Sequence, residues 1–398
     1  MTAPTPPLDI AALRADTPGC AHVVHFNHAG SSLMPQPVID AVVDHTLLEA
    51  KIGGYEAADQ TEERREGVYR SIARMIGAAS TEIALIENAT RAWDMAFYAI
   101  PFAPGDRILT SMAEYHSNVI AFLQVRDLGV SIEVVPNDEH GQIDVAALTA
   151  MLDDRVRLVS LSHMPTNGGL LQPAAAVGAA LRGSRALYLL DACQTVGQLP
   201  IDVREIGCHL LSASSRKYLR GPRGSGFLYC DAAVLDGLTP PMLDGHAAEW
   251  TSRDGYTIRD DARRFENWEH AIANELGLGA AVDYALGLGM DSIWERVFAQ
   301  ATTLREQLSH IPGVTTHDLG EAKGGIVTFS IAGVTPRTAM TELTRQTINI
   351  RSSGVGSTRY DMEDRGLERI LRASVHYLTT DEEIDRLTSG VEHLAATA

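Results

Sequence analysis

The chain is poor in cysteine and in basic residues. Four cysteines occur among 398 residues, and none of them forms a C-x-x-C pair. This scarcity argues against a disulfide framework or a structural zinc, so no metal is expected, and it indicates a reducing compartment. The 33 lysines and arginines are outnumbered by 51 aspartates and glutamates, which gives a formal net charge of -18. A nucleic-acid partner is therefore not expected, because phosphate binding requires basic patches.

Long apolar runs and a targeting signal are absent as well. No uninterrupted apolar stretch reaches the roughly 18 residues that a membrane helix needs. The proline-rich residues 1–8 lack a basic region followed by an apolar run, so no secretory signal is predicted. We therefore expect a cytoplasmic protein with no membrane partner.

Short apolar runs alternate with helical patterns between residues 81 and 230. Four of the runs are typical of buried strands: residues 107–110, 131–135, 156–161 and 186–190. The segments between them, such as 117–127 and 173–181, have helical spacing. This alternation predicts an α/β fold with a mostly parallel sheet, in which ligands bind beyond the carboxyl ends of the strands.

The pattern changes after about residue 274. A long helical stretch, residues 275–307, is followed by shorter predicted strands at 325–331 and 370–375. A chain of this length exceeds one ordinary core. We therefore predict a large α/β domain, residues 20–273, and a smaller α+β domain of residues 274–398 together with residues 1–19.

An aspartate and a lysine follow neighbouring predicted strands. Asp191 ends one apolar run, and Lys217 comes after the next run, residues 209–212. A glycine-rich turn, residues 221–226, then leads into a further strand. Either residue alone is more often a turn aspartate or a surface lysine. Together they indicate pyridoxal phosphate (PLP) chemistry, in which a lysine forms a Schiff base with the cofactor and a carboxylate keeps the pyridine nitrogen protonated. Ser214 and Arg216 can supply part of a phosphate cradle.

With these motifs in place, the sequence resembles the class V aminotransferases, the superfamily that includes the cysteine desulfurases. The resemblance runs from Phe-Asn-His-Ala-Gly at residues 26–30 to residues 380–385. It implies the PLP-dependent transferase fold type I. It also implies a small-molecule amino-acid substrate and a homodimer with the site at its interface.

The resemblance assigns cofactor roles to several further residues. Residues 87–92 resemble the phosphate loop of the family and implicate Ala89 and Thr90. The simpler alternative is that Asn88 or Thr90 caps a helix at residues 93–100. Residues 114–118 resemble the E-H-x-x-N motif, which places Tyr115 over the pyridine ring with His116 as the fallback. The phenolic oxygen of the cofactor is assigned to Asn167, with a similar role for Gln194.

The substrate residues are also implied by the resemblance. Residues 371–374 resemble the Arg-x-Ser of the family, in which the arginine clamps the substrate α-carboxylate, and this assigns Arg372. Asn27 and Arg359 are assigned to the substrate with it. A surface arginine at the end of a strand is the simpler alternative for Arg372.

The chain departs from the cysteine desulfurases in two places. They carry a catalytic cysteine in an R-x-G-x-x-C pattern, but residues 351–359 contain none, and no cysteine follows Cys230. Cys193 is expected to pack as a small buried residue. Many relatives also read R-F-E-x-G-T where this chain has residues 264–269, and their threonine reaches the phosphate of the partner subunit. Here Glu269 occupies that position, so the contact is lost or Trp268 and Glu269 face the substrate pocket.

Residues 264–269 and 357–363 resemble the branch of the family that contains hercynylcysteine sulfoxide lyase and isopenicillin-N epimerase-like proteins. This favours a C–S lyase that performs β-elimination on a cysteine S-conjugate or a cysteine sulfoxide. A class V amino-acid aminotransferase or epimerase is the alternative. A non-catalytic regulator would be expected to have lost Lys217 or Asp191. An NAD enzyme would carry G-x-G-x-x-G between its first strand and helix, where none is found.

Overall fold

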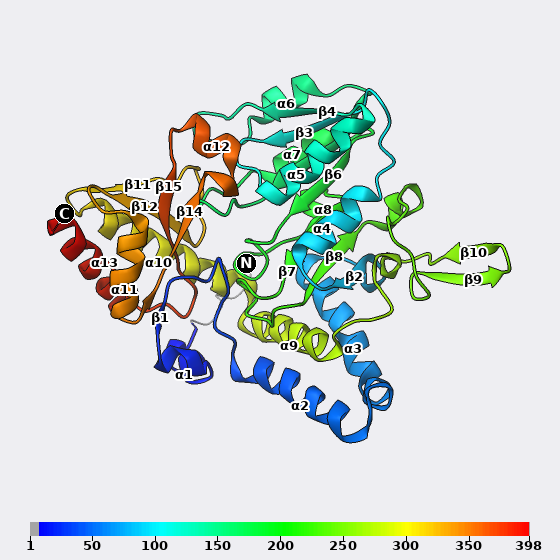
Figure 1. Ribbon diagram of the computed structural model, residues 1–398, viewed down its shortest axis with the longest axis horizontal. Coiled ribbons are helices and arrows are strands. Elements are labelled where there is room, and N and C mark those ends of the chain that lie inside the picture. The colour runs from blue at the N-terminus through cyan, green and yellow to red at the C-terminus, as the bar shows by residue number, and fades with distance from the viewer. Residues whose placement is uncertain (1–7, 398) are drawn as a thin grey trace, which may run out of the picture.

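The larger part of the protein is built on a seven-stranded sheet (Figure 1). The computed structural model describes residues 8–397. The strand order is β2-β8-β7-β6-β5-β3-β4, and only β8 runs antiparallel to its neighbours. The strands are β2 (Ile83–Ile86), β3 (Arg107–Ser111), β4 (Ser131–Val135), β5 (Val156–Ser162), β6 (Leu187–Asp191), β7 (Leu210–Ser214) and β8 (Gly226–Cys230). The prediction of an α/β fold with a mostly parallel sheet is confirmed.

The apolar runs of the sequence form these strands because both faces of the sheet are covered. In β6, Tyr188 and Leu190 belong to one hydrophobic cluster, whereas Leu187 and Leu189 belong to another. Alternate side chains of a strand point to opposite faces, so each face has its own core. The helices that follow the strands are α4 (Ala89–Tyr98), α5 (His116–Val125), α6 (Val145–Met151), α7 (Ala174–Leu181) and α8 (Val203–Ile206).

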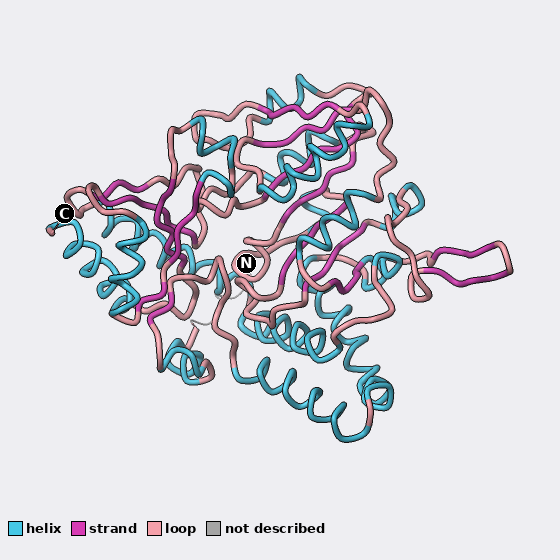
Figure 2. Tube along the Cα trace, in the orientation of Figure 1, coloured by secondary structure: helices cyan, strands magenta, loops and turns pink. Residues whose placement is uncertain are grey.

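A second, antiparallel sheet lies toward the C-terminal end of the chain. Its order is β11-β12-β15-β14. The strands are β11 (Val314–Thr316), β12 (Ile326–Ile331), β14 (Arg351–Gly354) and β15 (Arg369–Ser374), and the helices around them are α10 (Met290–Ser309), α11 (Pro336–Arg345), α12 (Arg359–Asp364) and α13 (Asp381–Ala396). Figure 2 shows this sheet and its helices beside the larger sheet.

The helical stretch predicted as one segment is two helices. It divides into α9 (Ile272–Leu288) and α10 at Gly289, whose φ of 87° few other residues adopt. The Gly289 N–H bonds the carbonyls of Ala285 and Leu286, which ends α9.

The N-terminal segment packs against elements from both parts of the protein. After α1 (Ile10–Ala15), β1 (Val24–His25) pairs in parallel with β13 (Ile348–Asn349). The next helices, α2 (Gln36–Ile52) and α3 (Gly54–Ile76), pack against α9. The predicted domain limits stay a prediction. Residues 1–7 lie outside the described part of the chain.

A hairpin of β9 (Ala248–Ser252) and β10 (Gly255–Ile258) projects from the body of the molecule (Figure 1). Its side chains are largely exposed, and they include Trp250 and Tyr256. Between residues 8 and 397, no helix has the length and apolar character needed to cross a membrane.

Candidate active site

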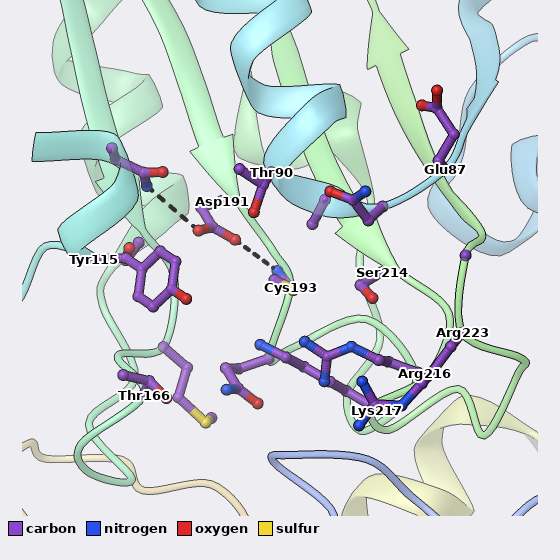
Figure 3. A pocket seen from close by; sticks show the side chains of 17 residues that line it. Glu87, Thr90, Tyr115, Thr166, Asp191, Cys193, Ser214, Arg216, Lys217 and Arg223 are labelled. Atoms are coloured by element: carbon purple, nitrogen blue, oxygen red, sulfur yellow. Dashed lines mark hydrogen bonds between the residues drawn. The ribbon is translucent and has the colours of Figure 1, made fainter. Parts of the chain in front are cut away.

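A cavity of about 310 Å³ opens at the carboxyl ends of the parallel strands (Figure 3). Its lining includes Asp191 at the end of β6, Ser214 at the end of β7 and Ser162 at the end of β5. Because β8 runs antiparallel, the turn before it reaches the same edge and brings Gly224 into the lining. The fold thus gathers residues that are far apart in the sequence.

Asp191 and Lys217 both line this cavity. One Asp191 oxygen accepts the backbone N–H of Cys193 at 2.9 Å, and the other accepts the Asn118 amide at 3.3 Å (Figure 3). Burial raises the pKa of Asp191, while the Lys217 ammonium group opposes this rise. The carboxylate is therefore fixed by two donors and faces one cation.

The predicted phosphate residues lie together at another part of the cavity. Ala89, Thr90, Ser214 and Arg216 all line it. Asn88 is the N-cap of α4, and its side chain accepts the Arg91 N–H at 3.0 Å. The cap therefore does not use Thr90, whose hydroxyl is left for the cavity.

Tyr115 and His116 occupy different environments. Tyr115 precedes α5 and lines the cavity, whereas His116 does not. The two rings pack together with their centroids 4.3 Å apart. Of the two residues proposed for the ring face, the structure brings Tyr115 to the cavity.

Gln194 lines the cavity, but Asn167 does not. The Asn167 amide instead donates to Asp361 of α12 at 2.7 Å. The preceding residue, Thr166, takes the place in the lining, because neighbouring residues of this turn face opposite sides. The geometry thus favours Thr166 over Asn167 for a contact with a bound molecule.

Arg372 projects from β15 and does not itself line the cavity, but it contacts Thr166, which does. Its guanidinium donates to the Thr166 hydroxyl at 2.6 Å, to the Thr166 carbonyl at 3.0 Å and to Asn27 Oδ1 at 3.4 Å. Burial lowers the pKa of Arg372 below its usual value. Asn27 therefore belongs to the surroundings of Arg372. Arg359 lies apart from them, exposed on α12 and paired with Glu363.

Several lining residues were not selected from the sequence or were placed differently, and three of them illustrate why. Asn118 lies three residues after Tyr115, and helical spacing could have identified it. Arg223 lies in the glycine-rich turn, which gave no such signal. Cys193 was expected to pack as a buried residue, and this was wrong, because it is only partly buried and lines the cavity.

The residues present fit a bound PLP molecule. Gln194 Oε1 is buried and has no hydrogen-bond partner in the described structure. The helix N-terminus, hydroxyls and guanidinium near Thr90 suit an anion, and Asp191 suits a protonated ring nitrogen. Gly226 allows the close approach of β8 to this loop, since a Cβ there would lie 2.5 Å from the Ala213 carbonyl oxygen and 3.4 Å from Ala89 N.

A lysine and a carboxylate at neighbouring strand ends of such a sheet define the class of fold type I PLP enzymes. The chain matches the Aminotransferase class-V family over residues 24–387. It therefore belongs to this family, which is PLP-dependent.

Named relatives agree with this assignment. A probable cysteine desulfurase of Methanothermobacter thermautotrophicus is 30% identical, covering 96% of this chain and 97% of the relative. The apo cysteine desulfurase of Thermococcus onnurineus superposes with a TM-score of 0.91 at 24% identity, covering 100% and 99% of the two chains. A cystine C–S lyase in complex with its product, cysteine persulfide, superposes with a TM-score of 0.85 at 22% identity, covering 94% and 99%. These structures share the fold of this chain.

Proposed function

We propose that this chain is a PLP-dependent C–S lyase that performs β-elimination on a cysteine S-conjugate or a cysteine sulfoxide, as hercynylcysteine sulfoxide lyase does. The family and the relatives named cysteine desulfurase support an enzyme that acts on C–S bonds. The cystine C–S lyase supports the same chemistry on this fold.

Each proposed role follows from a position in the cavity or, for Arg372, from its contact with the lining residue Thr166. When bound, the cofactor supplies an electron sink for the substrate carbanion. Lys217 is the attachment point and moves the α-proton, and Asp191 holds the proton of the ring nitrogen. Arg372, kept in place by Thr166, binds the substrate carboxylate. Tyr115 packs against the bound molecule.

The choice of β-elimination over desulfuration rests on the absence of a cysteine from residues 351–359. A desulfurase transfers sulfur to a cysteine of the protein, but residues 351–359, which form β14 and the turn after it, contain none. Cys208 and Cys230 are buried, and Cys20 lies near Arg14. Cys193 lines the cavity, but its backbone N–H donates to Asp191, so it lies at the end of the cavity proposed for the pyridine ring of the cofactor. The sulfur product is therefore released.

The balance of the reaction is simple. Lys217 takes the α-proton, the Cα–H electron pair forms a Cα=Cβ bond as the Cβ–S bond breaks, and the sulfur leaves with the Cβ–S electron pair and takes up one proton, as a thiol or a sulfenic acid. The remaining 2-aminoacrylate reacts with water to give pyruvate and ammonia.

Product analysis of the holoenzyme tests this proposal. Cysteine S-conjugates and cysteine sulfoxides are expected to give equal amounts of pyruvate, ammonia and a sulfur product. Borohydride reduction followed by peptide mapping should place the cofactor adduct on Lys217. Conversion of 2-oxo acids to amino acids without pyruvate would favour an aminotransferase, and α-proton exchange with inversion would favour an epimerase. Either outcome would contradict the lyase.

We also infer that the chain forms a homodimer. A groove of about 510 Å³ lies between the turn joining α2 to α3 and the loop before α9, and it shares no lining residue with the cavity. It is lined by Tyr55, which is 76% exposed, Trp268, which is 59% exposed, and Glu269. Exposed aromatic residues of this kind mark protein contacts. Light scattering should give a dimer that Trp268→Glu weakens, while a monomeric wild type would contradict the inference.

A further inference from the structure

A second carboxylate, Glu114, is buried behind Asp191. It follows β3 and is 1% exposed. Four groups donate to it: the Ser162 hydroxyl at 2.5 Å, the Tyr115 N–H at 2.8 Å, the Asn118 amide at 2.9 Å and the Thr110 hydroxyl at 2.9 Å. Such a set of donors favours the ionised form of a buried carboxylate.

The Asn118 side chain connects Glu114 to Asp191. Its amide nitrogen donates to Glu114 Oε1 and also to Asp191 Oδ2, at 2.9 and 3.3 Å. Both neighbours are acceptors when ionised, so this orientation of the amide is the one that satisfies both. Asn118 is itself only 3% exposed. Two buried carboxylates are thus held one amide apart.

This arrangement has an electrostatic consequence. The Asp191 charge raises the pKa of Glu114, beyond the larger effect of burial. The interaction of two charges is mutual, so an ionised Glu114 also strengthens the hold of Asp191 on a proton. The other titratable groups facing this pair are Lys217, Cys193 and Tyr115 in the cavity and Tyr360 of α12.

We propose that Glu114 is a positioning residue with two effects: it orients Asp191 through the Asn118 amide, and its charge strengthens the ion pair between Asp191 and the protonated ring nitrogen of the cofactor. This inference rests on the proposed placement of PLP on Lys217. Glu114 touches neither the cavity nor the substrate, since it is absent from the lining. Its proposed effect on the ring nitrogen acts through Asp191, while its bonds from the Tyr115 N–H and the Ser162 hydroxyl hold two lining residues in place.

The experiment follows the proton on the ring nitrogen. Wild type, Glu114→Gln and Glu133→Gln are loaded with PLP that carries ¹⁵N in the ring, and the ¹⁵N shift is recorded between roughly pH 6 and pH 10. Glu133 is a matched control, because it is a carboxylate of the same sheet that pairs with Arg107 at its edge. In Glu114→Gln the nitrogen should lose its proton about one pH unit earlier than in wild type. Glu133→Gln should titrate as wild type does.

A second variant separates charge from structure. Asn118→Ala removes a donor from Asp191 but keeps the Glu114 charge, so its titration should not move to lower pH. A purely structural role of Glu114 predicts the same response in both variants, and this result would overturn the inference. The inference would also be overturned if the ring nitrogen of Glu114→Gln titrated at the wild-type pH, or if Glu133→Gln shifted that titration as much as Glu114→Gln does.

Two further results complete the test. If Glu114→Gln does not fold, Ser162→Ala removes the shortest donor to Glu114 and should give a smaller shift in the same direction, and no shift would overturn the inference. Failure of the wild type to form a reducible adduct on Lys217 would instead overturn the proposed function. In Glu114→Gln, kcat should fall while KM for the amino acid stays unchanged.

Discussion

The cavity has two ends that differ in how completely one chain builds them. At the Asp191 end, each carboxylate oxygen has a donor from the same chain, and Asn118 behind it is buried. At the Thr90 end, Asn88, Thr90 and Arg223 are exposed. The first end is preorganised by the fold, since its donors come from the loop directly after β6 and from helix α5. The second end is open, and the proposed homodimer would place another copy of the chain beside it.

The largest effect is expected from a change at the Asp191 end. Asp191→Asn keeps the shape of the side chain but removes the charge that holds the ring proton. It should bind PLP with a normal spectrum and lose at least about 100-fold in kcat. Stopped-flow turnover of the holoenzyme measures this. Near-normal turnover would show that this end is not the one that supports the chemistry.

Arg372→Ala tests the part of the cavity that comes from the second sheet. A charged bidentate hydrogen bond contributes about 1.5–3 kcal/mol, so the variant should weaken substrate binding by about tenfold or more. The cofactor spectrum should not change. Arg359→Ala is the control, because Arg359 lies exposed on α12, and it should bind substrate normally. Equal losses in both variants would contradict the assignment of the clamp.

These two predictions rest on sequence signals of different kinds. Asp191 and Lys217 were recognisable because polar residues after buried strands of a parallel sheet must meet at one edge. Arg372 was found only through the family resemblance, since it projects from within β15 and no strand end marks it. The direction of a side chain in a turn was not predictable either. Thr166 and Asn167 are adjacent, and only the packing of α12 decides which one faces Asp361.

Similar reasoning applies to the fold. Apolar runs predicted β3 to β6 to within a residue at each end, because burial on both faces leaves little choice of residue. The break at Gly289 was missed, since a glycine within a helical pattern is tolerated and only its backbone angle reveals the end of α9.

Acid should destabilise the folded protein in part through a histidine buried beside Asp191. His163 follows β5, and its backbone N–H donates to the Asp191 carbonyl. Burial lowers the pKa of the His163 imidazole to about 4. The unfolded chain, with a histidine pKa of about 6.5, therefore binds more protons below that pH. The stability that depends on neutral His163 is full above pH 6.5 and falls as the pH drops. At pH 5.5 this loss is about 1.4 kcal/mol.

Urea unfolding at pH 7.5 and pH 5.5 measures this loss. The two conditions lie about one unit on either side of the histidine pKa of the unfolded chain, about 6.5. His163→Gln keeps a polar side chain that can reach the Thr195 hydroxyl, the present partner of His163. It should lose less stability between the two conditions than wild type. An equal loss would assign the acid sensitivity to other groups, such as the buried His28 and His376, whose pKa values are also lowered by burial.

A smaller effect is expected at the exposed end. Thr90→Ala removes one hydroxyl from a site that also has Ser214, Arg216 and the N-terminus of α4. One hydrogen bond contributes about 0.5–1.5 kcal/mol, so PLP affinity should fall several-fold while kcat of the loaded enzyme is kept. Fluorescence titration of the apoenzyme with PLP checks this. A loss as large as that of Asp191→Asn would mean that the two ends are equally critical.

The smallest effect is expected from the thiol in the cavity. Cys193 contributes its backbone N–H to Asp191, and alanine retains that donor. Burial also raises the pKa of the Cys193 thiol, which disfavours the nucleophilic thiolate. Cys193→Ala should therefore change turnover by less than about threefold, because only a small side-chain atom is lost at a partly buried position. Two results together would contradict this expectation: a folded, PLP-loaded Cys193→Ala protein that loses most of its activity, and a persulfide on Cys193 in the wild type. They would establish sulfur transfer to the protein and would place the acceptor thiol at the Asp191 end of the cavity.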